Sequence, residues 1–350
     1  MSKHKSAISN RKSVLSESEL SQIEQAAAEY EWETVRDLTA EALNAPDLAP
    51  AEEFDLRWHR AKAFDNLWDL ESAAGEMQQM LVLARTATDD ARAANALNML
   101  AFNFILVGKF EESGEVAHEA RALARTAKSP QLEARALNVL GWHANFVNEP
   151  ELSEKYYRQA LALAENGVSP QDETWALRNL RFAPSVRNDP RQIDELLARA
   201  LQIARAHGDR LGELYALNRT AENRTDLAQK GYFWRQARDL ARQIDNRGMI
   251  SVLNNNLANF YLRFGLFQRA YVYAQEAVQF QQQSGARIIL LWSLETLANI
   301  ARETGNFTHA QQAYARLSES ASQADNRLHA ALASAGQGRL ALDEGKVGDA

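Results

Sequence analysis

The chain has 350 residues, of which 46% are hydrophobic and 24% charged, so it holds enough apolar side chains to build a folded core. Only 16 residues are Gly and 7 are Pro, which disfavours a turn-rich β fold and favours helices. The formal net charge of −7 disfavours a nucleic-acid partner, because such binding requires a basic surface. The absence of cysteine excludes disulfides, thiolate catalysis and cysteine-ligated zinc.

No segment of the sequence predicts contact with a membrane. The longest apolar run, Ile288 to Trp292, is far shorter than the roughly 18 residues of a membrane span. The basic N-terminus is not followed by the apolar stretch of a secretory signal. We therefore expect a cytoplasmic protein without a membrane partner, and we expect the basic residues 1–16 to form a disordered tail.

From residue 17 to residue 350 the chain repeats a pattern of two amphipathic helices joined by a short turn. One column of the second helix recurs every 40 residues, except for a single interval of 37 before Lys230: Ala73, Ser113, Ser153, Ile193, Lys230, Ala270, Ala310 and Ala350. The turn carries Gly108, Gly265, Gly305 and Gly345, with Asn148 and Asn188 in equivalent places. These residue types accept the left-handed conformation that ends a helix. The predicted repeats lie near 17–46, 54–86, 94–127, 134–167, 174–207, 214–245, 251–284, 291–324 and, truncated, 331–350.

The pattern resembles the tetratricopeptide repeat. The best matches are the pair Leu140-Gly141 in a first helix and the motifs Gly265-x-Phe267-x-x-Ala270 and Gly305-x-Phe307-x-x-Ala310. A 40-residue version is similar to the repeats of the maltose-regulon activator and other large bacterial signalling and regulatory proteins. The resemblance implies an all-α fold, a right-handed superhelix of about eight and a half antiparallel helix pairs.

Two departures from the pattern stand out. The three residues missing from the 37-residue interval lie between Asn218 and Lys230, where they either were lost neutrally or change the curvature of the array. The chain also stops at Ala350, where the ninth second helix should begin, so we expect a fragment whose missing part is C-terminal. In that case Leu332 and Leu340 should be exposed at an uncapped end that favours self-association.

The sequence gives no sign of catalysis. The seven histidines are scattered, and no two have the spacing of a helical zinc pair. A phosphate-binding glycine loop and a nucleophile elbow are also missing. We therefore predict a protein that is not an enzyme and needs neither metal nor cofactor.

The resemblance implies that fixed positions of the first helices line a concave surface. One such column is rich in Asn, whose amide can both donate to and accept from an extended peptide backbone. The alternative is that these amides bridge neighbouring helices. Tryptophans near the second helices, Trp32, Trp68 and Trp234, are expected to pack between repeats. The predicted peptide- or protein-binding residues are Asn98, Phe102, Arg135, Asn138, Trp142, Trp175, Arg178, Tyr215, Asn218, Asn255, Asn259 and Trp292.

The leading hypothesis is a scaffold for protein interactions, the N-terminal sensory or interaction region of a larger bacterial signalling or regulatory protein. Its partner would be a protein or peptide segment, which could come from a C-terminal effector domain of the same chain. A second hypothesis is a small-ligand sensor that uses Trp142, Trp175 and Phe182. A third is a self-assembly module that acts through the uncapped end.

Overall fold

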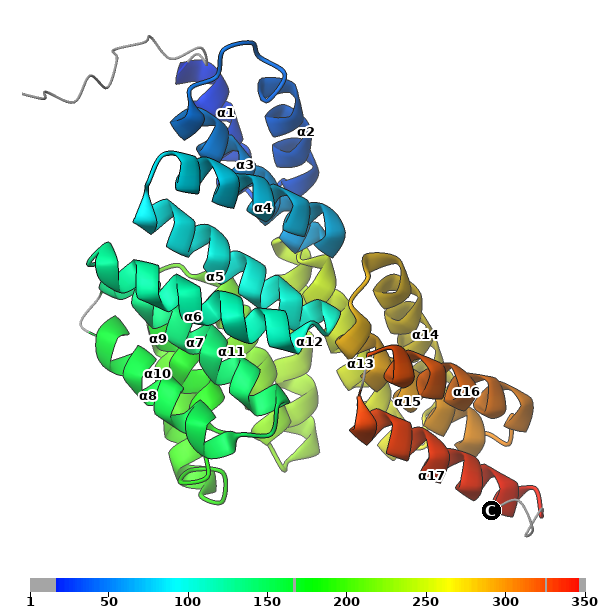
Figure 1. The fold of residues 1–350 in the computed structure, drawn as a ribbon. Coiled ribbons are helices and arrows are strands. Elements are labelled where there is room, and N and C mark those ends of the chain that lie inside the picture. The colour runs from blue at the N-terminus through cyan, green and yellow to red at the C-terminus, as the bar shows by residue number, and fades with distance from the viewer. Residues whose placement is uncertain (1–16, 166–167, 325, 346–350) are drawn as a thin grey trace, which may run out of the picture.

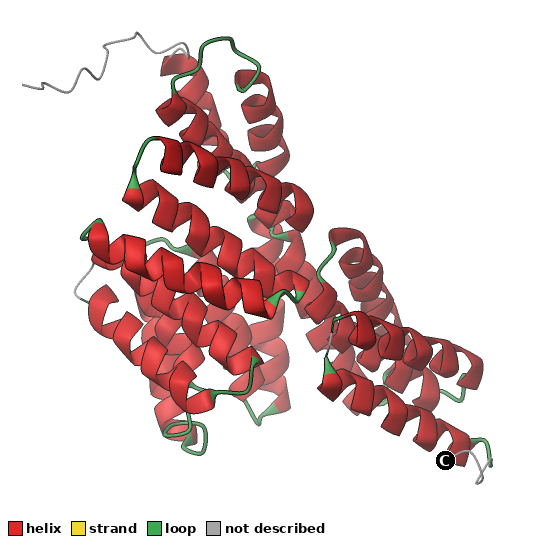
Figure 2. Cartoon of the chain, viewed as in Figure 1, coloured by secondary structure: helices red, strands yellow, loops and turns green. Residues whose placement is uncertain are grey.

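The computed structural model describes residues 17–165, 168–324 and 326–345, and within these ranges the chain is helical with no strand (Figures 1 and 2). Among the described residues, no helix is both long enough and apolar enough to cross a membrane. The helices are α1 (Glu17–Ala28), α2 (Trp32–Ala42), α3 (Pro50–Leu67), α4 (Leu70–Thr86), α5 (Asp90–Val107), α6 (Phe110–Thr126), α7 (Pro130–Phe146), α8 (Pro150–Ala164), α9 (Pro170–Leu180), α10 (Pro190–Ala206), α11 (Arg210–Asn223), α12 (Leu227–Gln243), α13 (Arg247–Arg263), α14 (Phe267–Ser284), α15 (Arg287–Glu303), α16 (Phe307–Gln323) and α17 (Arg327–Asp343).

Each helix packs against the next, which confirms the predicted succession of helix pairs. The small columns of the sequence allow this close packing: Ala120, Ala160 and Ala200 in the second helices are fully buried. Gly141 shows why one position of the motif excludes a side chain. A Cβ at Gly141 would lie 2.8 Å from Cε1 of Tyr157 in the partner helix, closer than carbon atoms can approach.

Two first helices end early. Helix α11 has 14 residues where α7 and α13 have 17, so the three missing residues are lost from its last turn. Helix α9 has 11 residues and ends at Leu180. The nearby Pro184 has no amide hydrogen to continue the helix. The expectation that Phe182 lies on a first helix is therefore wrong, and its ring is 43% exposed in the following turn.

The superhelix closes on itself after one turn. Helix α3 contacts α13 and α5 contacts α15, although about 200 residues separate the members of each pair, and Figure 1 shows these parts of the chain meeting. We call the apolar part of this junction the closure contact: Trp68 stacks on Phe280 with ring centroids 6.0 Å apart and covers Gly248. The sequence columns did not predict this junction, because they describe only neighbouring repeats.

Polar bonds extend the closure contact. Trp32 donates from Nε1 to the carbonyl of Ile244 at 2.8 Å, and Asn246 donates from Nδ2 to Oδ1 of Asn66 at 3.0 Å. Arg247 forms an ion pair with Glu33 at 2.7 Å. Trp32 is thus buried against Ile23 and Leu56 of the first repeats, as expected of a packing residue, and it also donates a hydrogen bond to a distant repeat.

The turns between paired helices adopt the predicted left-handed conformation, except that Asn188 does not and that Trp68, which was not predicted to, does. The four predicted glycines and Asn148 have positive φ, whereas Asn188 does not. Trp68 occupies the equivalent position in the second repeat and has φ of 62°, a conformation that is unfavourable for a bulky side chain. The strained backbone is held in place because the indole ring packs into the closure contact.

The C-terminal helix differs from expectation. Leu340 was expected to be exposed, but it is 3% exposed because it packs with Tyr314 and Leu317 of α16. The exposed leucines of α17 are instead Leu328 and Leu342, at 66% and 55%. The residues from 346 onward, including Ala350, lie outside the described part of the chain.

Candidate functional site

The odd-numbered helices form the inner layer of the superhelix, and the even-numbered helices form the outer layer. This follows because successive odd-numbered helices contact one another, as α5 does α7 and α7 does α9, and because the helices that meet across the turn, α3 with α13 and α5 with α15, are odd-numbered too. All the predicted binding residues lie on α5, α7, α9, α11, α13 and α15. The structure therefore places them on the inner layer, and their exposure and contacts differ from one helix to the next.

The asparagine column is buried between helices. Asn98 donates from Nδ2 to the carbonyl of Leu132 at 3.2 Å, and Asn138 donates to the carbonyl of Asp172 at 2.9 Å. The acceptor of Asn98 lies in α7 and that of Asn138 lies in α9, in each case the first helix of the following repeat. These bonds are the ones expected if the amides bridge neighbouring helices. The Oδ1 atoms of both asparagines are buried without a partner. Contact of this column with a bound segment stays a prediction.

The same column continues in α11 and α13 with different partners. Asn218 is 1% exposed and accepts at Oδ1 from Nε1 of Trp234 at 3.1 Å and from Nδ2 of Asn256 at 2.9 Å. Asn255 is 7% exposed, and its Oδ1 has no partner. Asn259 donates to Oγ1 of Thr296 at 2.8 Å. The side chains of Asn218 and Asn259 thus join neighbouring helices.

Three of the predicted aromatic residues form an inner aromatic cluster. Phe102 stacks on Trp142 with centroids 4.8 Å apart and meets the edge of Trp175 at 5.4 Å. The cluster also packs toward the closure contact, because Phe102 and Trp142 lie against the apolar group that contains Ile289. Among the described residues, the ring of Phe182 stacks with none of these rings and lies 4.0 Å from the guanidinium of Arg181. Trp142 and Trp175 therefore share a site with Phe102 rather than with Phe182.

Arg178 is a charged residue of the inner layer that lies among aromatic rings. Its side chain is 9% exposed, and its guanidinium lies over the rings of Tyr215 at 4.6 Å and Trp175 at 5.6 Å. Within the described residues it has no ion pair and no hydrogen bond to its side chain. Burial lowers the pKa of Arg178 to about 10, so the charge is retained at neutral pH without a counter-ion.

The other arginines nearby are paired. Arg135 forms a two-point ion pair with Asp172 at 3.2 and 3.3 Å, and Glu222 accepts from both Arg181 and Arg219. Burial opposes the charge of Glu222, but the two arginines hold its pKa below the usual range. Asp172 and Glu222 are therefore engaged by these arginines and are not paired with Arg178.

Two residues of α3 face this region from across the superhelix. Lys62 and Arg135 repel each other electrostatically, and burial together with Arg135 lowers the pKa of Lys62. Asp65 is close enough to Tyr215 of α11 for its negative charge to raise the pKa of the tyrosine hydroxyl. Burial raises the pKa of Asp65 itself to about 6, although the positive charge of Lys62 lowers it. We call Lys62, Asp65, Arg135, Arg178 and Tyr215 the interior cluster.

The sequence predicted three members of the interior cluster and missed two. Lys62 and Asp65 lie in the second repeat, whose match to the repeat pattern is weak, and their position opposite α7 and α11 depends on closure of the superhelix. Trp292, the last predicted residue, is 41% exposed and lies apart from the cluster, 6.5 Å from the ring of His329. In the described part of the chain, no group of three or more His, Asp or Glu side chains could hold a metal ion.

Comparison with known proteins supports the repeat assignment. Residues 92–166, which span α5 to α8, match the family model of the tetratricopeptide repeat. This part of the chain is a tetratricopeptide repeat region, and the described helices form a superhelix of the same kind. The curated proteins yield no match to the chain.

Several solved structures share this fold. A Rap protein in complex with competence and sporulation factor has a TM-score of 0.63 and 11% identity, over 88% of this chain and 98% of that one. The apo form of RapI has a TM-score of 0.53 and 12% identity, over 76% and 98%. The signal-transduction ATPase PH0952 from Pyrococcus horikoshii, with a tetratricopeptide repeat sensor, has a TM-score of 0.55 and 15% identity. That match covers 97% of this chain but only 51% of the ATPase.

Proposed function

We propose that this chain is a non-catalytic regulatory scaffold whose inner layer binds an extended protein or peptide segment that carries an anionic group. The observation that supports this most is the unpaired guanidinium of Arg178, held between Trp175 and Tyr215. A guanidinium that is largely removed from water binds a carboxylate more strongly than one on the surface. A carboxylate from a bound segment would supply the missing partner.

The geometry around Arg178 suits a carboxylate. The two aromatic rings cover the guanidinium faces, and the donors of a guanidinium lie along its edge, where a carboxylate can accept two parallel hydrogen bonds. Desolvation makes such a pair stronger than it would be on the surface. Arg219 is close enough to Arg178 to lower its pKa, so a second positive charge would favour the same anionic group.

The aromatic and asparagine residues predicted from the sequence would contact other parts of the bound segment. Trp142 and Phe102 would offer an apolar surface beside the anionic anchor. Asn98 and Asn138 would contact the segment only after leaving their present acceptors in the next helix. A Rap protein of the same fold has been crystallised with competence and sporulation factor, which supports a binding role for a superhelix of this shape.

A random-peptide selection against the full chain, followed by fluorescence-polarisation binding, tests the proposal. Selected peptides should be rich in Asp and Glu, and Arg178→Gln should weaken their binding at least tenfold. The matched control is Arg125→Gln, which changes an arginine that is 68% exposed on the outer helix α6 and should leave affinity unchanged. Peptides that bind Arg178→Gln as tightly as the unchanged protein would contradict the proposal.

A further inference from the structure

Two junctions of the outer layer carry a pairing of arginine with glutamate. At two junctions, an arginine in the last turn of a second helix pairs with a glutamate in the first turn of the next first helix. Arg205 of α10 lies 2.8 Å from Glu213 of α11, and Arg125 of α6 lies 3.8 Å from Glu133 of α7. Arg121 also reaches Glu133, at 3.3 Å.

Between α12 and α13 the arginine is present without the glutamate. Arg242 occupies the repeat position of Arg205, and Ile250 occupies that of Glu213. In the described part of the chain, Arg242 has neither an ion pair nor a side-chain hydrogen bond. Arg238, at the repeat position of Arg121, donates to the hydroxyl of Tyr273 at 2.6 Å, and its buried Nε has no acceptor.

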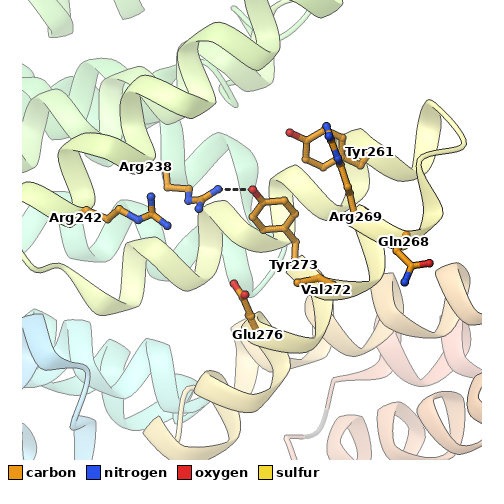
Figure 3. Close-up of a pocket in the computed structure, with 8 residues that line it drawn as sticks. All are labelled: Arg238, Arg242, Tyr261, Gln268, Arg269, Val272, Tyr273 and Glu276. Atoms are coloured by element: carbon orange, nitrogen blue, oxygen red, sulfur yellow. Dashed lines mark hydrogen bonds between the residues drawn. The ribbon is translucent and has the colours of Figure 1, made fainter.

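The two arginines line a cleft of about 360 Å³ between α12 and α14 (Figure 3). Arg269 enters it from α14, where its guanidinium lies 5.9 Å from the ring of Tyr261. Tyr261 and Tyr273 stack with centroids 5.6 Å apart and form an aromatic wall. The acidic residue of the lining is Glu276, which accepts a hydrogen bond from Asn254 at 3.1 Å.

The chemistry of this cleft points to a phosphate ligand. Three guanidiniums and one carboxylate leave a net charge of about +2, on a chain whose formal net charge is −7. A phosphate monoester carries about −1.5 to −2 at neutral pH, which matches this excess, whereas a single carboxylate would neutralise half of it. Arginine also binds phosphate oxygens through two parallel hydrogen bonds. The volume falls in the range of small-molecule sites.

We propose that the cleft between α12 and α14 is a binding site for a small phosphate monoester, with Arg238, Arg242 and Arg269 as its anion-binding residues. The ester's organic part would lie against the rings of Tyr261 and Tyr273. This site is on the outer layer, away from the interior cluster, and does not depend on the function proposed above.

Isothermal titration calorimetry of the full chain with phenyl phosphate tests the proposal at low ionic strength. We expect saturable binding of one equivalent, weakened at least tenfold by Arg242→Gln and by Arg269→Gln. Arg205→Gln is the matched control, because its guanidinium already pairs with Glu213, and it should leave affinity unchanged. Ile250→Glu places a carboxylate where Glu213 stands beside Arg205, and it should also weaken binding at least tenfold.

Four outcomes would overturn the proposal. The first is that phenyl phosphate shows no saturable binding, and the second is that Arg242→Gln binds it as tightly as the unchanged protein. The third is that Arg205→Gln loses as much affinity as Arg242→Gln, and the fourth is that benzoate binds as tightly as phenyl phosphate. A phosphoserine peptide that binds at least tenfold more tightly than phenyl phosphate would assign the cleft to a phosphorylated protein instead. Circular dichroism melts show whether each variant is folded. If the partly buried Ile250→Glu does not fold, the two arginine variants still decide the result.

Discussion

The closure contact and the interior cluster are both formed by helices that are distant in sequence, yet they are built in opposite ways. At the closure contact, Trp68 covers Gly248 and stacks on Phe280. In the interior cluster, Arg178 has aromatic faces around it but no counter-ion, and Asp65 has a buried oxygen without a hydrogen-bond partner. The first region holds the superhelix shut, and the second is the one that we propose binds a partner.

The comparison would be broken most directly by Trp68→Ala. This change removes the ring that bridges the second and seventh repeats, and we expect it to lower the free energy of unfolding by about 3–5 kcal/mol, as for other buried tryptophans. Urea denaturation followed by circular dichroism measures the loss. A change below about 1 kcal/mol would show that the closure contact does not stabilise the fold.

A second test adds atoms to the closure contact instead of removing them. In Gly248→Val the new Cβ would lie 2.2 Å from Cε2 of Trp68, so the helices must move apart. We expect a loss of about 1–3 kcal/mol in unfolding free energy. The control is Gly75→Ala, at a helical position with no atom within 4 Å, which should be neutral or stabilise the fold by up to about 1 kcal/mol. Equal effects of the two variants would contradict the geometry.

The asparagine column combines features of the two regions, because its amide nitrogens are hydrogen-bonded and several of its buried Oδ1 atoms are not. We expect Asn138→Ala to cost about 1–2 kcal/mol, because the buried carbonyl of Asp172 loses its donor. Asn188→Ala, at an exposed turn position, should change stability by less than about 0.5 kcal/mol. A thermal melt of Asn138→Ala that matches the unchanged protein would argue against the bridging role and favour contact with a bound segment.

The smallest expected effect is a pH dependence in the interior cluster. Because burial raises the folded-state pKa of Asp65 to about 6, its contribution to stability is present below pH 4 and is lost as the pH rises through 6. Asp65→Asn should therefore gain stability relative to the unchanged protein between pH 4 and pH 7, by about 1 kcal/mol because the side chain is partly exposed. Unfolding curves at both pH values measure this, with the exposed Glu71→Gln as control. A difference that is constant with pH would refute it.

Most of the fold could be predicted from the sequence, because each repeat contacts mainly its neighbours and the same columns recur along the chain. The spacing located the helix pairs and the shortened sixth repeat. It did not reveal the early end of α9, because the repeat columns keep their spacing up to Arg181 and so predict a helix of full length. Pro184 was the residue that indicated an earlier end. It also could not reveal closure, which depends on the accumulated rotation of several repeats rather than on any single one.

The candidate site could be predicted only in part for the same reason. Arg135, Arg178 and Tyr215 occupy regular inner positions of well-matched repeats. Lys62 and Asp65 reach the same place from the opposite side of the turn. One signal was available: Trp68 replaces the usual Gly or Asn at a turn that requires positive φ, and such a substitution indicates that its side chain has a structural partner.

The closure contact also limits how this array can evolve. Repeat proteins usually gain and lose whole repeats, since each unit contacts only the next. Here Trp68 and Gly248 meet after one full superhelical turn, so inserting or deleting a repeat between them would rotate one away from the other. The number of repeats from α4 to α12 is therefore fixed by geometry. Evolution of that interval is restricted to single substitutions and to short changes in length, such as the one that shortened α11.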